Sequence, residues 1–200
     1  HILYVSPKWA RRRGELFDAA EYADRLTEAG VEAVELYCKD HHGVCYYPCS
    51  EGLPYPRDVV GELCSATQAR GMHFLAYFSV GFDEYALGVH PEWRAIDARG
   101  AAQFQAPFHF ACLASPYRDY AIQQIRELVQ RYPIEGLWLD IVPFAWDAPQ
   151  EIWMQQVLPA PCYCSSCRAR FEEVTGRPLP GPDPTHEERR IAYSFLLENV

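Results

Sequence analysis

The stretch DVVGELCSATQARGMHFLAYF, residues 58–78, decides the class of fold. Apolar residues at helical spacing follow Asp58, and Gly71 then supplies the left-handed position that commonly closes a helix. The apolar run Met72–Phe78 that comes next is typical of a buried strand. The stretch therefore predicts a helix followed by a strand, the repeating unit of an α/β fold.

The same order of helix and strand recurs on both sides of this stretch. Asp18 opens a predicted helix as a capping-box pair with Glu21, and Gly30 ends it. Helices placed between strands specify parallel pairing, because parallel neighbours cannot be joined by a tight turn. The predicted strands are His1–Val5, Val31–Cys38, Met72–Phe78 and Ile134–Ile141, and the predicted helices begin near Asp18, Asp58, Ser115 and Thr185.

A doubly wound sheet and a (β/α)8 barrel both fit four such units. The barrel is favoured because no glycine-rich phosphate loop follows the first predicted strand and the loops after the strands are long and aromatic. Such a barrel takes about 250 residues. We therefore predict that residues 1–200 form the first half of a single (β/α)8 TIM-type catalytic barrel, and we expect further catalytic groups beyond residue 200.

Composition limits the class of protein and its partners. Hydrophobic residues make up 49% of the chain and aromatic residues 14%, which indicates a globular protein. A net charge of −9 argues against a nucleic-acid partner, and no apolar run approaches the about 20 residues of a membrane helix. We expect a cytoplasmic protein. A leader segment ahead of His1 and a homo-oligomer formed through regions outside this chain are both left open.

Four cysteines predict a structural metal site. Cys162, Cys164 and Cys167 form a Cys-x-Cys-x-x-Cys motif, and Cys112 lies about fifty residues earlier. Zinc takes four sulfur ligands in tetrahedral geometry and needs no open position when it holds loops together. Buried free thiols or two disulfides are the alternative. The spacing predicts a zinc-binding loop at about residues 142–176.

The polar segment Lys39-Asp40-His41-His42-Gly43 follows the second predicted strand, where a barrel presents its active-site face. Imidazole nitrogens can donate to and accept from vicinal hydroxyl groups, so the two histidines indicate recognition of a sugar. A solvated polar loop explains the same residues without a ligand.

Asp140 ends the most hydrophobic predicted strand. Burial raises the pKa of a carboxyl group unless cations or hydrogen bonds hold it ionised, and Lys39 or the histidines could do so from a neighbouring strand end. Asp140 is a candidate nucleophile for glycoside hydrolysis, and an aspartate that caps a loop is the alternative. Asp147, in the loop that follows, is expected to shape the loop or the rim of the pocket.

Several segments resemble known glycosidases. The segments VELYCKDHHGVC (34–45) and GLWLD (136–140) resemble the α-L-fucosidases of glycoside hydrolase family 29, in which they carry a sugar-binding His-His pair and the aspartate nucleophile. The segments CLASPYR (112–118) and CYCSSC (162–167) are similar to the four-cysteine zinc cluster of family 42 β-galactosidases. The whole chain most resembles a hypothetical glycosyl hydrolase group that combines these features.

The resemblance implies Asp140 as catalytic nucleophile, structural Zn²⁺ on the four cysteines and a carbohydrate substrate. It implies substrate contacts by Lys39, His41, His42, Tyr77 and Trp138, of which the last two are also typical of barrel core. Two departures leave the sugar open. The fucosidase order Lys-His-His-Asp-Gly is permuted here, and no Asn-Glu pair, as in family 42, follows Asp140.

The sequence thus predicts a retaining glycoside hydrolase, α-L-fucosidase-like or β-galactosidase-like, whose acid/base group lies beyond residue 200. The alternative is a non-catalytic carbohydrate-binding barrel.

Overall fold

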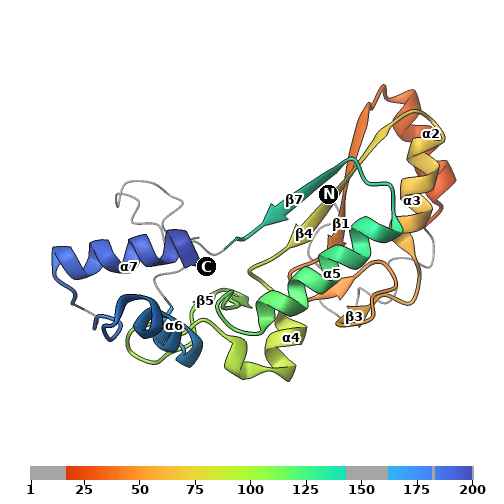
Figure 1. Cartoon of the computed structure of the whole chain (residues 1–200). Coiled ribbons are helices and arrows are strands. Elements are labelled where there is room, and N and C mark those ends of the chain that lie inside the picture. The colour runs from red at the N-terminus through yellow and green to blue at the C-terminus, as the bar shows by residue number, and fades with distance from the viewer. Residues whose placement is uncertain (1–16, 143–161, 182, 200) are drawn as a thin grey trace. The chain divides into compact units, whose positions relative to one another are not determined.

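The computed structural model describes residues 17–142, 162–181 and 183–199 (Figure 1). The predicted first strand, His1–Val5, and the loop residue Asp147 lie outside the described residues.

The chain divides into two compact units. Unit 1 comprises the residues up to Ser79 together with Tyr120–Asp140, and unit 2 comprises Val80–Asp119 and the residues from Ile141 on. That residues 1–200 belong to a single (β/α)8 barrel domain stays a prediction.

Unit 1 is a five-stranded sheet with helices. Its strands lie in the order β3-β2-β1-β4-β7, in which β4 pairs in parallel with both β1 and β7, and β2 pairs antiparallel with β1. This arrangement confirms the predicted α/β class with a parallel sheet, and closure into a barrel stays a prediction. The elements are α2 (Ala19–Glu28), β1 (Ala33–Lys39), β2 (Val44–Cys45), β3 (Leu53–Pro54), α3 (Val59–Gln68), β4 (His73–Ser79), α5 (Tyr117–Arg131, whose first residues belong to unit 2) and β7 (Gly136–Asp140).

Aspartate side chains begin two of these helices, as the sequence predicts. Asp18 accepts hydrogen bonds from the backbone N–H groups of Ala20 and Glu21, at 2.9 and 3.0 Å. Asp58 accepts one from Gly61 at 2.9 Å. Each carboxylate thereby satisfies N–H groups that have no partner within the helix.

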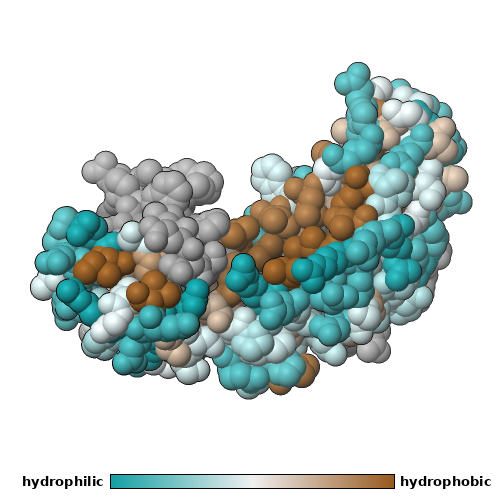
Figure 2. Space-filling model, in the orientation of Figure 1, coloured by the Kyte–Doolittle hydropathy of each residue, from teal (hydrophilic) through white to brown (hydrophobic). Residues whose placement is uncertain are grey.

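The two faces of the sheet differ. The face that packs against the helices is buried on β1 and β4, and its residues there are Val34, Leu36, Cys38, Phe74, Ala76 and Phe78. On the edge strand β7, Leu137 and Leu139 are exposed, and Trp138, which points to the other face, is 59% exposed. Hydrophobic side chains accordingly gather on the surface over the sheet (Figure 2). Parallel strands of this composition are usually covered on both faces.

Strand register brings the carboxyl ends of β1, β4 and β7 side by side. Tyr77 of β4 lies opposite Tyr37 on one side and Trp138 on the other, and Ser79 lies opposite Asp140. Side chains two residues apart on a strand point to the same face. Tyr77 and Ser79 therefore share one face of the sheet with Asp140.

Unit 2 is built from short elements around an aromatic and sulfur-rich core. The core gathers Phe82, Phe108 and Phe110 with three of the cysteines, and a smaller cluster joins Phe171 to Phe195. The elements are α4 (Glu84–Val89), the 3-10 helix η1 (Pro91–Trp93), the hairpin β5 (Phe104–Gln105) and β6 (Phe108–His109), α6 (Ser165–Thr175) and α7 (His186–Asn199).

The sequence predicts α7 but not α4, the hairpin or α6. Thr185 and Glu188 form the expected capping box of α7, in which the Thr185 N–H donates to Glu188 Oε2 at 2.8 Å and the Glu188 N–H donates to Thr185 Oγ1 at 3.3 Å. Helix α6 lies within the stretch predicted as a zinc-binding loop. None of the helices in the described ranges combines the length and the hydropathy of a membrane span.

Candidate active site and metal centre

The turn between β1 and β2 carries His41 and His42, and Asp40 shapes it. Asp40 Oδ1 accepts the N–H groups of His42 and Val44, both at 3.0 Å, and Oδ2 accepts the Tyr46 hydroxyl at 2.9 Å. Burial raises the pKa of the Asp40 carboxyl group, and these hydrogen bonds oppose it. Asp40 therefore holds the turn in place.

His41 is a buried imidazole, 3% exposed. Its Nδ1 lies 2.8 Å from the Ser79 Oγ, so a bond to the end of β4 orients the ring. Burial lowers the pKa of His41 to about 4, although the charge of Asp140 opposes the shift. His41 is therefore neutral at neutral pH.

A tyrosine hydroxyl holds the carboxylate of Asp140. Tyr77 donates its hydroxyl hydrogen to Asp140 Oδ2, and the Tyr37 hydroxyl is hydrogen-bonded to that of Tyr77. The two tyrosine rings lie 4.0 Å apart between centroids. A chain of hydrogen bonds thus runs from β1 through β4 to the end of β7.

The chain turns sharply after Asp140. Ile141 has φ 53°, a left-handed conformation that is unfavourable for a β-branched residue. Such strain at a strand end is common where a side chain must be held in a functional position.

Lys39 is placed differently from the prediction. A register shift between Tyr37 and Lys39 sets Lys39 opposite Phe78, on the helix-covered face. The side chain is fully buried, with its ammonium group 4.9 Å from the Phe78 ring centroid and 5.9 Å from that of Tyr120. This placement does not support a direct contact with substrate beside Tyr77.

The other candidates flank Asp140 and His41. Tyr77 is 5% exposed and contacts Asp140, and Trp138 is exposed beside it on the same face. His42 is partly buried in the turn. The sequence analysis missed Tyr37 and Ser79. Tyr37 lies two residues before the candidate Lys39 on β1, and Ser79 lies two residues after the candidate Tyr77 on β4. The alternation of side chains along a strand could therefore have suggested both.

Lowering the pH is expected to destabilise the protein through His41. The unfolded imidazole binds a proton near pH 6.5, whereas the folded one does so only near pH 4. The unfolded state therefore binds more protons between these values, and stability falls as the pH drops from 6.5 to 4, by up to about 3 kcal/mol. Urea unfolding of the wild type and of His41→Asn at pH 7 and pH 4.5 measures the difference. His186→Gln, which removes an exposed imidazole, is the control, and an equal pH dependence in all three proteins would contradict the assignment.

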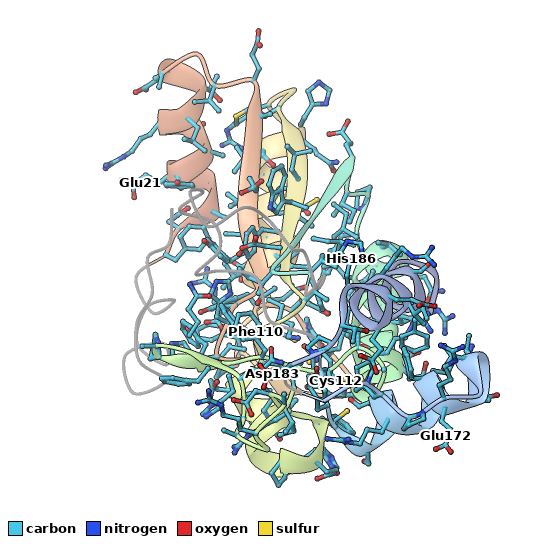
Figure 3. The ribbon with its side chains drawn as sticks, turned by 90° about the vertical axis from the view of Figure 1, so that its left-hand side faces the viewer. Glu21, Phe110, Cys112, Glu172, Asp183 and His186 are labelled. Atoms are coloured by element: carbon cyan, nitrogen blue, oxygen red, sulfur yellow. The ribbon has the colours of Figure 1, made fainter. Side chains whose placement is uncertain are left out.

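The four cysteines of the predicted metal site lie together in unit 2. Their sulfur atoms all lie within 4.8 Å of one another, and Figure 3 labels Cys112. The Cys112 sulfur lies 3.4 Å from that of Cys167 and 3.5 Å from that of Cys164. These separations are too long for a disulfide and close to the about 3.8 Å that tetrahedral zinc thiolates require.

Backbone N–H groups point at these sulfurs. Cys162 Sγ accepts from the N–H groups of Ile96 and Cys164, both at 3.4 Å, and Cys164 Sγ accepts from the Cys167 N–H at 3.5 Å. Cys164 also caps α6, where the helix dipole favours negative charge. The four cysteine sulfurs therefore fit a metal ion bound by thiolates. The identity of that ion is a proposal.

In unit 1, parallel strands place a carboxylate, a neutral imidazole and tyrosine hydroxyls at their carboxyl ends. Active sites of α/β enzymes with parallel sheets lie at this edge. The family model described as "Hypothetical glycosyl hydrolase 6" matches residues 18–141, and the chain belongs to this family.

The relatives with specific names are fucosidases. The chain is 27% identical over 144 residues to the tissue alpha-L-fucosidase of Rattus norvegicus, covering 68% of this chain and 27% of that protein. A putative alpha-L-fucosidase of Caenorhabditis elegans is 25% identical over 159 residues, covering 76% of this chain and 29% of that protein. The chain thus spans little more than a quarter of the length of these relatives.

Solved fucosidase structures are similar as well. Alpha-L-fucosidase isoenzyme 2 from Paenibacillus thiaminolyticus matches with a TM-score of 0.69 and 28% identity, covering 91% of this chain and 26% of that one. The Thermotoga maritima alpha-fucosidase in complex with fucose matches with a TM-score of 0.50 and 26% identity, covering 66% of this chain and 31% of that one. None of these relatives is described as a β-galactosidase, so they lend no support to the resemblance to family 42.

Proposed function

We propose that the full-length protein is a retaining glycoside hydrolase of the α-L-fucosidase type, with Asp140 as its nucleophile. The observation that carries this proposal is the position of Asp140 at the carboxyl end of β7, hydrogen-bonded to Tyr77 and opposite Ser79 in register. The named fucosidase relatives, 25–28% identical to the chain, support the substrate class.

Each neighbouring side chain has a role in this proposal. The Asp140 carboxylate attacks the anomeric carbon, and the Tyr77 hydroxyl holds one of its oxygens so that the other is aimed at the sugar. His41, neutral at neutral pH, offers a ring nitrogen to a sugar hydroxyl while Ser79 sets its orientation. The exposed ring of Trp138 supplies an apolar wall beside Tyr77.

The remaining groups come from the longer protein. Retaining hydrolysis also needs a proton donor for the leaving group, about 5 Å from the nucleophile. We place this acid/base group outside the chain, on later strands of a (β/α)8 barrel of which the sheet of unit 1 is a part.

Zinc completes the proposal as a structural ion. The four cysteine sulfurs of unit 2 would hold it, and the ion would link the segment around Cys112 to the start of α6. With four sulfur ligands it has no open position for substrate, so we assign it stability and no chemical step.

A panel of aryl glycosides tests the function. Full-length protein is expected to release the aryl group fastest from an α-L-fucoside, because the named relatives of the chain are α-L-fucosidases. The rates on an aryl β-galactoside and an aryl α-galactoside are measured for comparison. Fast cleavage of a galactoside alone would move the substrate class away from fucose, and binding of sugar without any release would favour the carbohydrate-binding barrel.

A further inference from the structure

The segment between β4 and α5 has secondary structure of its own. Residues 80–116 contain α4, η1 and the β5–β6 hairpin, and they begin directly after Ser79, the last residue of β4 (Figure 1). In enzymes with parallel sheets, the loops that follow the carboxyl ends of the strands bind substrate. A role in substrate binding is therefore expected for side chains that this segment exposes.

The β5–β6 hairpin has a buried face and an exposed face. Phe108 is 6% exposed and packs on Phe82 in the core of unit 2, with the ring centroids 5.2 Å apart. Phe104 is 54% exposed and lies opposite His109 in register. Its ring centroid lies 4.9 Å from that of His109. The exposed face of the hairpin thus presents a phenyl ring beside an imidazole.

Glu84, the first residue of α4, orients this imidazole. Glu84 Oε1 accepts a hydrogen bond from the His109 N–H, and both carboxylate oxygens lie 3.2 Å from His109 Nδ1. An ionised carboxylate only accepts, so Nδ1 is the donor and Nε2 is the acceptor of the neutral ring. Both side chains are 28% exposed, and within the described part of the chain His109 Nε2 has no hydrogen-bond partner.

Phe104, His109 and Glu84, together called the hairpin patch, have the chemistry that recognises a pyranose sugar. The C–H groups of a sugar ring can pack on an exposed phenyl ring. Sugar hydroxyl groups can donate to a carboxylate oxygen and to the second imidazole nitrogen. A protein partner would instead be marked by a broad apolar patch, whereas here a single ring is flanked by polar groups.

We propose that the hairpin patch binds the sugar to which the cleaved fucose is attached, with Phe104 stacked on its ring. This inference rests on the proposed function, because it assigns the leaving group of that reaction to unit 2. His109 Nε2 and the Glu84 carboxylate accept hydrogen bonds from hydroxyl groups of the same sugar. Phe104 then determines how well a fucosylated oligosaccharide is used relative to a fucoside with a small leaving group.

Two substrates that differ only in the leaving group test the patch on the full-length protein. The leaving group of fucosyllactose is a disaccharide, whereas that of α-L-fucosyl fluoride is a single atom. Phe104→Ala is expected to lower kcat/KM for fucosyllactose about tenfold relative to fucosyl fluoride, which is the effect of one stacked ring. Phe104→Tyr, which keeps a ring, should retain the wild-type ratio. Tyr22→Ala, which removes an exposed ring from α2 of unit 1, is the control and should also retain it.

Lactose binding separates this inference from the proposed function. The imidazole resonances of His109, identified by their loss in His109→Gln, are expected to shift when lactose is added to the wild type and to shift far less in Phe104→Ala. If neither fucoside is cleaved, the proposed function fails, and the lactose titration alone decides whether the patch binds sugar. An unchanged ratio of the two kcat/KM values in Phe104→Ala would overturn the inference. Lactose that leaves the His109 resonances in place would do the same.

Discussion

Replacing Asp140 with Asn in the full-length protein is expected to lower kcat by on the order of 10³-fold or more. An amide cannot attack the anomeric carbon to form the glycosyl ester, but its oxygen can still accept the Tyr77 hydroxyl, so the fold is kept. The measurement is kcat on the best aryl glycoside, with the unfolding temperature recorded beside it. Asp183→Asn, which changes an exposed loop carboxylate of unit 2, is the matched control.

A rescue experiment separates a nucleophile from a carboxylate that only positions other groups. Asp140→Gly leaves a space at the end of β7 that a small anion such as azide can enter. If Asp140 is the nucleophile, azide restores release of the aryl group and gives a glycosyl azide of inverted configuration. Near-normal kcat in Asp140→Asn would remove Asp140 from this role.

The second large effect is expected at the cysteine cluster. Cys164→Ser should reduce bound zinc well below one ion per chain and lower the free energy of unfolding by at least about 3 kcal/mol. The reason is that Cys164 is both a sulfur ligand and the N-cap of α6, and binding of a structural ion contributes directly to folding. Zinc content by elemental analysis and denaturant unfolding measure the two parts of the effect.

A buried cysteine outside the cluster provides the control. Cys64→Ser alters a 1% exposed thiol on α3 and should keep the full zinc content. Removal of zinc from the wild type by a chelator should reproduce the loss of stability seen in Cys164→Ser. Unchanged zinc stoichiometry in that variant would contradict the metal assignment.

Much of the fold of unit 1 is predictable because its signals are local. Asp18 and Asp58 begin helices through hydrogen bonds to N–H groups two or three residues away, so a short window of sequence contains both partners. The order of helices and strands then requires parallel pairing. Unit 2 is less predictable, because α4 has only six residues and each strand of the hairpin only two, which is too short for a periodic pattern.

The candidate site is also predictable only in part from local sequence signals. The sequence points to Asp140 and His41, since Asp140 ends the most hydrophobic predicted strand and His41 lies in the polar segment that follows another. It does not reveal that Ser79 orients His41 or that Tyr37 continues the chain of hydrogen bonds to Asp140. Those contacts join residues 38 or more positions apart and depend on how the strands align.

By itself, the sequence determined the α/β class, the starts of the capped helices and the residue types available for a metal and for sugar chemistry. Only the tertiary structure decided which of them meet: it turned Lys39 onto the opposite face and set Ser79 against His41. The physical reason is that helix caps and apolar periodicity act over a few residues, whereas register acts between distant strands. A single extra residue in a strand reverses the face to which a side chain points.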